Sequence, residues 1–296
     1  MSEEPAGRKS RPLLGIALML LAILMLTILD STAKYLSAAL PVAQIVWGRF
    51  FFMLLLTFAF LPWLGFWGLC RTARPLQQVM RGATLLLTTG ALFLGLKHLP
   101  LAETYAITFV SPFLVALGAA ALLGERVDTR RWLAILGGFL GVLVVIRPGS
   151  GAFTWHVIFP LAMATFWAAN QLITRALGAT DQPMVTLFYT SLIGTLGAGL
   201  FAAFAWHPPG PAEWLGLAWM GAIGFLSQLA VIYAFALAPA SLLAPLAYSQ
   251  IVWAALIGYL VFADIPDGYT WLGAAIVILS GLALVARRAP GKRDVR

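Results

Sequence analysis

The sequence predicts an all-α membrane protein with ten transmembrane helices, arranged as two inverted five-helix repeats. Three observations predict this fold: the composition, an internal repeat and the distribution of basic residues. Of the 296 residues, 61% are hydrophobic and only 10% are charged, whereas soluble domains carry about 25% charged residues. The apolar runs are long and do not alternate with polar residues, so they are typical of spanning helices and not of barrel strands.

The segment from Gly82 to Val285 contains one pattern twice, at an offset of 139 residues and without a gap. An internal repeat in an apolar chain is typical of secondary transporters, in which two related halves surround one binding site. The aligned pairs include Gly82 with Gly221, Pro100 with Pro239, Asp128 with Asp267 and Trp132 with Trp271.

Proline, glycine and charged residues divide the chain into ten apolar spans. The first run, from Leu13 to Leu29, lacks a small-residue cleavage site, so we expect a retained helix and not a signal peptide. Short connections make consecutive helices antiparallel neighbours. The predicted spans are 13–35, 42–62, 76–97, 101–123, 130–147, 154–176, 183–205, 212–237, 241–262 and 270–287. The predicted parts are an N-terminal tail 1–12, repeats 13–148 and 149–288, and a C-terminal tail 289–296.

Basic residues gather in alternate loops and in both tails, while the other set of loops holds only Lys34, Lys97 and Arg147. The positive-inside rule therefore predicts that both termini are cytoplasmic. Because five helices is an odd number, the second repeat must enter the membrane from the opposite side. The aligned loops agree: Arg126, Arg130 and Arg131 in the first are replaced by Ile265, Tyr269 and Thr270 in the second.

Several segments resemble the drug/metabolite transporter superfamily, in its ten-helix EamA-type branch, over residues 13–288. They are WGRFFF at Trp47–Phe52, LPLAETYAITFVSPF, LLGERVDTRRWLAILGGFLGVLVVIRPG and ALAPASLLAPLAYSQIVWAALIGYLVFAD. One departure is Asp264, where the family usually has Glu. The resemblance implies a bacterial inner-membrane carrier that exports or exchanges small metabolites, commonly amino acids. It also implies alternating access, with the third, fourth, eighth and ninth helices around a central cavity.

Three ionisable residues, Asp30, Lys34 and Arg49, fall in the outer half of the first two helices. Such residues are costly at membrane depth and are candidates for function. Asp30 and Lys34 are four residues apart, so they lie on one helix face and can pair, and Arg49 can complete a network. Two interpretations are open: the network takes part in transport, or it neutralises itself and only holds the two helices together.

Polar side chains that align across the repeat indicate a shared cavity. Thr89 aligns with Gln228 and Ser111 with Gln250, and buried amides need partners. Thr88 and Ser227 also align, but we expect these hydroxyls to bond their own helix backbone. The predicted substrate-binding residues are Thr89, Tyr105, Thr108, Ser111, Trp167, Asn170, Gln171, Gln228, Tyr248, Gln250 and Trp253.

In the sixth helix, Met163, Trp167, Asn170 and Thr174 recur at helical spacing, with Gln171 beside them, so this stripe should face protein or water. The fourth and ninth helices contain Pro112 and Pro245. Proline weakens a helix and frees a carbonyl on the preceding turn, so each marks either a simple kink or a hinge with ligand groups.

An aromatic and amide lining suits an amphipathic zwitterion, and the sequence shows no deep Arg or Lys pair for a phosphate. It therefore favours amino acids, including aromatic and apolar ones, over sugar phosphates, with export of drugs or other amphipathic metabolites as the alternative.

No cofactor or metal is expected, because the single cysteine and three histidines show no ligand spacing. A membrane enzyme is the rival class, but the chain shows no catalytic motif. A channel would need a pore ring, usually formed by several subunits.

The expected partners are a small-molecule substrate and lipid, and no nucleic acid, because the net charge of +8 reflects topology. One chain suffices for a path, and a dimer is also compatible. The segment GGFLG, with Gly137, Gly138 and Gly141, either packs the fifth helix on the tenth or forms a dimer face. Coupling to protons is open, and Asp30 and Glu103 are the acids near membrane depth.

Overall fold

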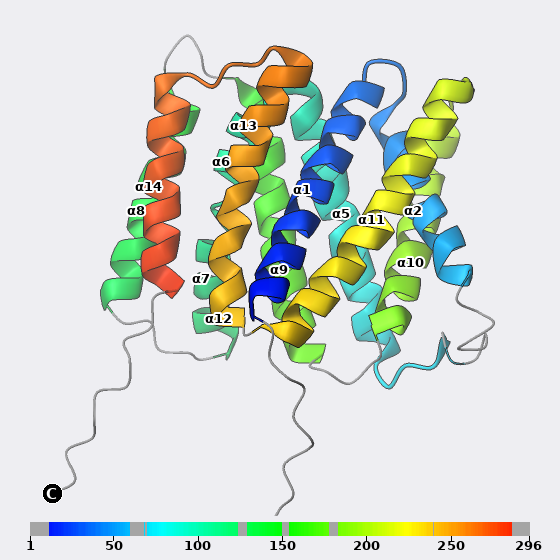
Figure 1. The fold of residues 1–296 in the computed structure, drawn as a ribbon, viewed down its shortest axis with the longest axis horizontal. Coiled ribbons are helices and arrows are strands. Elements are labelled where there is room, and N and C mark those ends of the chain that lie inside the picture. Colours follow the sequence, from blue (N-terminus) through cyan, green and yellow to red (C-terminus); the bar gives the residue numbers. More distant parts are fainter. Residues whose placement is uncertain are drawn as a thin grey trace, which may run out of the picture.

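The computed structural model describes residues 12–59, 68, 70–123, 129–149, 154–177, 183–238 and 240–285. These residues form a bundle of helices that lie side by side and contain no strand (Figure 1). Six of the described helices are long and apolar enough to cross a membrane, and four shorter helices are also apolar. The all-helical membrane fold is confirmed. Both predicted tails, apart from Pro12, and the loop with Arg126 lie outside the described residues.

Each predicted span corresponds to one helix or to a broken set of short helices. Pro75 and Pro211 occupy the first turns of α5 and α11, where their missing N–H groups cost nothing. The first half contains α1 (Pro12–Leu36), α2 (Val42–Phe58), α5 (Pro75–His98), α6 (Leu101–Thr108), α7 (Ser111–Leu123) and α8 (Thr129–Ile146). The second half contains η1 (Trp155–Val157), α9 (Ile158–Leu177), α10 (Pro183–Phe204), α11 (Pro211–Leu237), α12 (Ala240–Leu243), η2 (Ala244–Tyr248), α13 (Ser249–Phe262) and α14 (Gly268–Val285).

Equivalent helices of the two repeats run in opposite directions. Helix α8 packs along α14 with Gly137 against Ser280 and Gly141 against Val277, so residue numbers rise on one helix as they fall on the other. Helices α2 and α10 are antiparallel in the same way, with Trp47 against Gly199 and Phe50 against Gly194. This is the arrangement that an inverted repeat requires. The start of α1 and the end of α14 lie at the same end of the bundle (Figure 1).

The helix contacts follow the same symmetry. The most extensive pairs are α8 with α14, α1 with α11, α2 with α10 and α5 with α9. The equivalents of α1 and α11 in the other repeat are α9 and α5, so the α1–α11 pair corresponds to the α5–α9 pair. Each of the other two pairs joins a helix to its own equivalent. The two halves are therefore interleaved, and the surfaces between them run through the middle of the bundle.

The fourth and ninth spans are both interrupted at aligned positions. Helix α6 ends at Thr108 and α7 begins at Ser111, while the 3-10 segment η2 precedes α13. Phe109 and Tyr248, which align across the repeat, lie at these breaks with ring centroids 4.9 Å apart. Pro112 is the second residue of α7, and Pro245 lies in η2. The expectation that proline weakens these spans is confirmed.

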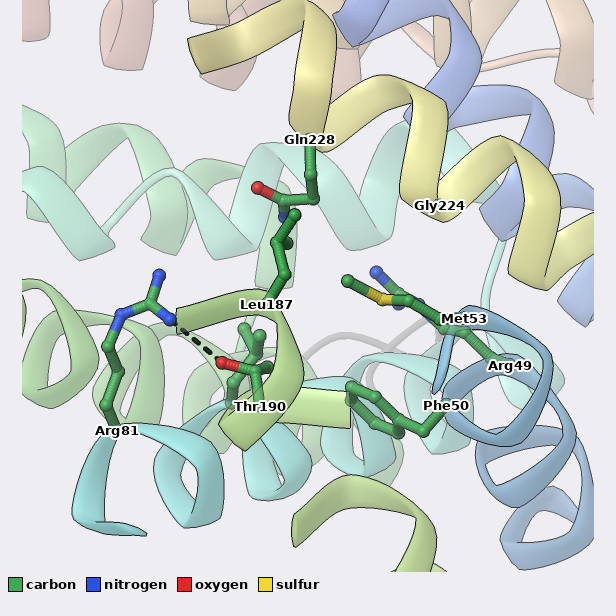
Figure 2. A pocket seen from close by; sticks show the side chains of 9 residues that line it. Arg49, Phe50, Met53, Arg81, Leu187, Thr190, Gly224 and Gln228 are labelled. Carbon is green, nitrogen blue, oxygen red and sulfur yellow. Dashed lines mark hydrogen bonds between the residues drawn. The ribbon is translucent and has the colours of Figure 1, made fainter. Parts of the chain in front are cut away.

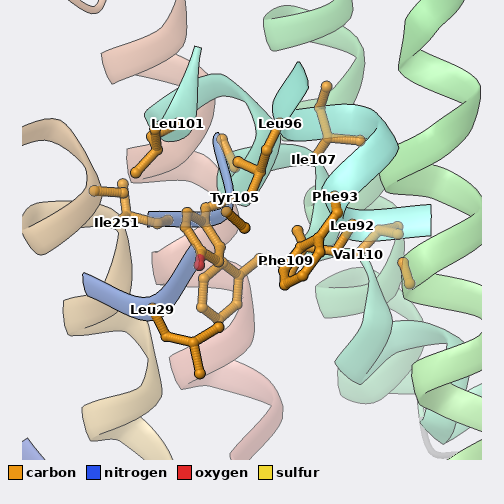
Figure 3. Packing of buried hydrophobic residues seen from close by; sticks show 14 of the residues in the cluster. Leu29, Leu92, Phe93, Leu96, Leu101, Tyr105, Ile107, Phe109, Val110 and Ile251 are labelled. Atoms are coloured by element: carbon orange, nitrogen blue, oxygen red, sulfur yellow. The ribbon is translucent and has the colours of Figure 1, made fainter. Parts of the chain in front are cut away.

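The hydrophobic core surrounds these breaks. Tyr105 of α6 packs beside Leu29 of α1 and Ile251 of α13 (Figure 3), and all three side chains are almost completely buried. Elements from both repeats therefore meet at one buried centre.

The glycine segment of α8 packs against α14, which decides between the two interpretations of GGFLG. A methyl group on Gly141 would lie 2.9 Å from the carbonyl oxygen of Gly273, and one on Gly273 would lie 2.6 Å from the carbonyl oxygen of Gly141. The two helix backbones approach this closely because neither residue has a side chain. GGFLG therefore joins the fifth and tenth spans.

We predict that Gly141→Ala destabilises the protein, because its methyl group would overlap Val277 and the α14 backbone. Overpacking of this kind costs about 1–3 kcal/mol. Thermal unfolding in detergent, followed by tryptophan fluorescence, measures the change. The matched control is Gly90→Ala in α5, where the added methyl meets no atom within 4 Å. Equal melting temperatures for the two variants would contradict the assigned packing.

Candidate functional site

A small cavity lies between α2, α5, α10 and α11, in the interior of the bundle (Figure 2). Its volume is about 20 Å³, which is room for one or two water molecules. The lining residues are Arg49, Phe50, Met53, Arg81, Leu85, Leu187, Thr190, Gly224 and Gln228. In this conformation the cavity is too small for a metabolite.

Arg49 enters the cavity from α2. The residue is only 9% exposed, and its Nε is buried without a hydrogen-bond partner. The rings of Phe50 and Phe93 each lie 5.7 Å from the guanidinium carbon, so aromatic faces hold the cation in place. Arg49 is thus a fixed, buried positive charge at the cavity wall.

Arg81 enters the same cavity from α5, on the other side (Figure 2). Its Nε donates to Thr174 Oγ1 at 3.0 Å, and its Nη1 donates to Thr190 Oγ1 at 2.9 Å. Both acceptors are neutral hydroxyls. The guanidinium is therefore positioned by α9 and α10 without being neutralised by them.

The expectation that no deep basic pair exists was wrong, since Arg49 and Arg81 line one cavity. Arg81 belongs to the basic set that the sequence places toward the cytoplasm. However, α5 begins six residues earlier, at Pro75, which at 1.5 Å per residue places Arg81 about 9 Å inside the helix. The separation of Arg81 from Pro75 is therefore the sequence feature that indicates this depth.

Asp30 binds across the bundle to α6. The Tyr105 hydroxyl donates to Asp30 Oδ2, and the Gln250 side chain interacts with the same hydroxyl. Asp30 Oδ1 is buried without a partner. Arg49 attracts Asp30 electrostatically, but the two side chains are not one of the ion pairs found among the described residues. The predicted residues Asp30, Tyr105 and Gln250 are therefore brought together from both repeats.

The expected pairing of Asp30 with Lys34 is wrong. Lys34 Nζ instead donates to Asp264 Oδ2 at 2.7 Å and to the Leu99 carbonyl at 3.1 Å, above the Phe262 ring. The short Asp30 side chain reaches inward to Tyr105, whereas the long Lys34 side chain reaches the loop of residues 263–267. Lys34 thus ties α1 to the α13–α14 connection and not to its own helix neighbour.

A second ion pair holds the same loop. Arg147 Nη1 lies 2.7 Å from Asp267 Oδ2, and Asp267 Oδ1 accepts hydrogen bonds from the Thr270 backbone N–H at 2.8 Å and hydroxyl at 2.7 Å. Burial by itself raises the pKa of Asp267, but these bonds and Arg147 outweigh it and hold the pKa below its ordinary value. Asp267 therefore anchors the start of α14 as a carboxylate.

The polar stripe of α9 faces protein, as predicted. Asn170 Nδ2 donates to the Arg81 carbonyl at 2.8 Å and to Thr84 Oγ1 at 3.0 Å, so the amide donor is used to join α9 to α5. Trp167 is half-buried. Gln171 is exposed, and therefore does not lie beside Asn170 in the interior.

The remaining predicted residues fall into three groups. Gln228 is the one member of the predicted substrate-binding set that lines the cavity. Thr89, Thr108 and Ser111 are buried, and Thr108 Oγ1 donates to the Tyr105 carbonyl. The Tyr248 hydroxyl points toward Gly281 of α14, and Trp253 Nε1 is buried without a partner.

Thr88 and Ser227 bond the backbone of their own helices, to the Thr84 and Gly224 carbonyls, as expected. Thr190 and Phe50 of the cavity wall were not predicted. Sequence gives little signal for them, because one hydroxyl and one ring among many apolar residues have no distinctive spacing.

Comparison with known proteins identifies the family. The model of the EamA-like transporter family matches twice, over residues 13–147 and 154–287. The chain belongs to the EamA-like transporter family. It is therefore a bacterial-type multi-pass membrane transporter of small molecules, built from two repeats.

Relatives are similar over nearly their whole length. The chain is 30% identical to a riboflavin transporter of Rhizobium johnstonii, over 95% of this chain and 93% of the relative. It is 26% identical to an S-adenosylmethionine uptake transporter of Rickettsia prowazekii, over 92% of each. A solved structure titled "Crystal structure of protein" shares the fold, with a TM-score of 0.62, 20% identity, and coverage of 92% of this chain and 95% of that one. These relatives give no support to the expected amino acid substrate.

We predict that Tyr105→Phe destabilises the protein, because it removes the donor to Asp30 Oδ2 and leaves a buried carboxylate less satisfied. A buried group without its partner costs about 1–3 kcal/mol. Thermal unfolding in detergent measures the loss. Tyr259→Phe on the exposed face of α13 is the matched control. The assignment fails if both variants melt at the wild-type temperature.

We also predict an acid-dependent loss of stability from Asp267. Its folded pKa is depressed, so the stabilisation is present above the unfolded pKa of about 4 and is lost as pH falls through the folded value. Melting temperatures measured from pH 7 down to pH 3 should converge for wild type and Asp267→Asn at the acid end. A constant difference between wild type and Asp267→Asn at every pH would refute this.

Proposed function

We propose that this protein is a secondary carrier of the bacterial inner membrane that moves a small amphipathic metabolite by alternating access. The proposal rests on a group of buried and half-buried polar side chains that both repeats supply, next to an internal cavity. Asp30 and Tyr105 come from the first repeat, and Gln250 and Gln228 come from the second. Ionisable side chains are costly at membrane depth, so their presence there favours a functional role.

The architecture supports movement of one half against the other. We take 13–148 and 149–288 as the two inverted units, each with five spans and with both termini in the cytoplasm. The cavity of about 20 Å³ cannot accept a metabolite until the helices around it separate. The fourth and ninth spans, one from each half, meet where the halves are in contact, and the break in each span is a point at which that span can bend.

Riboflavin is the first substrate to test, because a relative of that name is 30% identical over nearly the whole chain. Its flat ring system carries carbonyl and nitrogen acceptors, which match the donors of Arg49, Arg81 and Gln228. S-adenosylmethionine, named for another relative, carries a net positive charge and fits a wall with two arginines less well.

Amino acids are the second candidate, and one observation favours them. Asp30 Oδ1 and Arg49 Nε are both buried without a hydrogen-bond partner. An ammonium group suits the first atom and a carboxylate suits the second, so a zwitterion would satisfy both. An aromatic amino acid belongs in the same panel as riboflavin.

Counterflow in proteoliposomes tests the function. Vesicles loaded with unlabelled riboflavin, S-adenosylmethionine or tryptophan are offered the same compound in labelled form. We expect saturable exchange for at least one compound and a fall of about threefold to tenfold in Gln228→Ala, since one hydrogen bond is worth about 1 kcal/mol. Gln77→Ala, near the start of α5, is the matched control and should exchange as wild type does.

Two results would count against the proposal. Flux that rises linearly with concentration and shows no counter-exchange indicates a channel. If the melting curve shows that the protein is folded but none of the compounds is transported, small amphipathic metabolites of this kind are excluded as substrates.

A further inference from the structure

The buried Arg49 and the half-buried Arg81 face one cavity, and neither has an acidic partner among the described residues that line it. Arg49 comes from α2 and Arg81 from α5, and the described lining contains no Asp or Glu. From this geometry we infer that the cavity binds an anionic group of the transported molecule, a carboxylate or a phosphate ester. The inference rests on the proposed transport function and favours its amino acid candidate, or a phosphorylated compound, over neutral riboflavin, because it requires an anionic group at this wall.

The charges around this cavity do not balance. The ion pairs among the described residues join Lys34 to Asp264 and Arg147 to Asp267, so both cavity arginines are left out of them. Asp30 is the acid that acts on Arg49, and its Oδ2 already accepts from Tyr105. Two positive charges and one negative charge leave one excess positive charge. Such an excess is costly in a region shielded from water, and one bound anion would cancel it.

The two guanidinium groups are also fixed in position before any ligand arrives. Thr174 and Thr190 hold Arg81 through two hydrogen bonds, and two phenylalanine rings flank Arg49. Arg49 Nε is more than nine-tenths buried with its residue and has no acceptor. Figure 2 shows Arg49 and Arg81 on opposite sides of the cavity, with the Gln228 amide reaching in from α11.

The guanidinium group suits an oxyanion better than it suits a neutral acceptor. Its planar donors match the two oxygens of a carboxylate or phosphate. Thr190 and Gln228 add neutral groups at the same wall. The volume of about 20 Å³ accommodates little more than the oxygens of one such group, so the remainder of the molecule needs the open conformation.

The positive charge is not duplicated across the repeat. The residue 139 positions after Arg81 is Met220, and the one after Arg49 is Phe188. Both arginines therefore come from the first repeat, and the anion site lies on one side of the pseudo-symmetric interface. The substrate should bind with its anionic end toward α2 and α5.

Matched ligand pairs test the inference on the full-length protein. Indole-3-acetate and indole-3-acetamide share a ring and differ by a carboxylate charge, while flavin mononucleotide and riboflavin share a ring and differ by a phosphate. Melting temperature in detergent is measured against the concentration of each. We expect that, in at least one pair, the anion raises the melting temperature at a concentration at least tenfold lower than its neutral partner needs for the same increase. The two pairs separate carboxylate from phosphate recognition.

Variants assign the effect to the cavity. Arg49→Gln and Arg81→Gln should each abolish the preference for the anion. Arg49→Lys and Arg81→Lys keep the charge and should retain part of the preference. The Lys variants serve as the test if the Gln variants do not fold. Arg74→Gln, at the exposed start of α5, is the control and should keep the full preference. Equal binding of charged and neutral partners by wild type, or an unchanged preference in both Arg→Gln variants, would overturn the inference.

The test separates this inference from the proposed function. If neutral riboflavin exchanges saturably but no anion is preferred, the carrier function stands and the anion site is wrong. If anions stabilise the protein through Arg49 and Arg81 but no compound exchanges, the site stands and the carrier function is wrong.

Discussion

The apolar interior of a membrane protein requires each buried charge to find its partners within the helix bundle, and this constraint organises the structure. Asp30 and Arg49 are buried and Arg81 is half-buried, and hydroxyls and aromatic rings surround these three charged groups. These contacts link α1 to α6 and α5 to both α9 and α10. The polar interior and the helix packing are therefore one system, because moving a helix changes the environment of a charge.

The duplicated parts and the unduplicated parts of the chain serve different purposes. Antiparallel contacts between equivalent helices, and the contact of Phe109 with Tyr248 at the two breaks, follow the symmetry of the repeat. Arg49, Arg81 and Asp30 have no charged counterpart in the second half. A symmetric frame permits two related conformations, while an asymmetric set of charges gives the path one chemical preference.

The loop of residues 263–267 connects the charged interior to the surface. Its two acids bind bases from different helices: Asp264 binds Lys34 of α1, and Asp267 binds Arg147 beyond α8. Both pairs are partly exposed, so water screens them and each contributes modestly to stability. Separation of α1 from the α13–α14 connection would break the first pair, and this makes the loop sensitive to any movement between the halves.

The sequence by itself determined the helical membrane fold, the repeat, its inversion and the residue types of the polar centre, because hydrophobic length and periodicity depend only on the order of residues. It also predicted the backbone bonding of Thr88 and Ser227, which is local to one helix turn. Only the tertiary structure decided that Lys34 binds Asp264 and not Asp30, that Asn170 joins α9 to α5, and that Arg81 reaches the cavity. These partners depend on how each helix is rotated about its axis and on how far each side chain extends, and both are set by packing between segments distant in sequence.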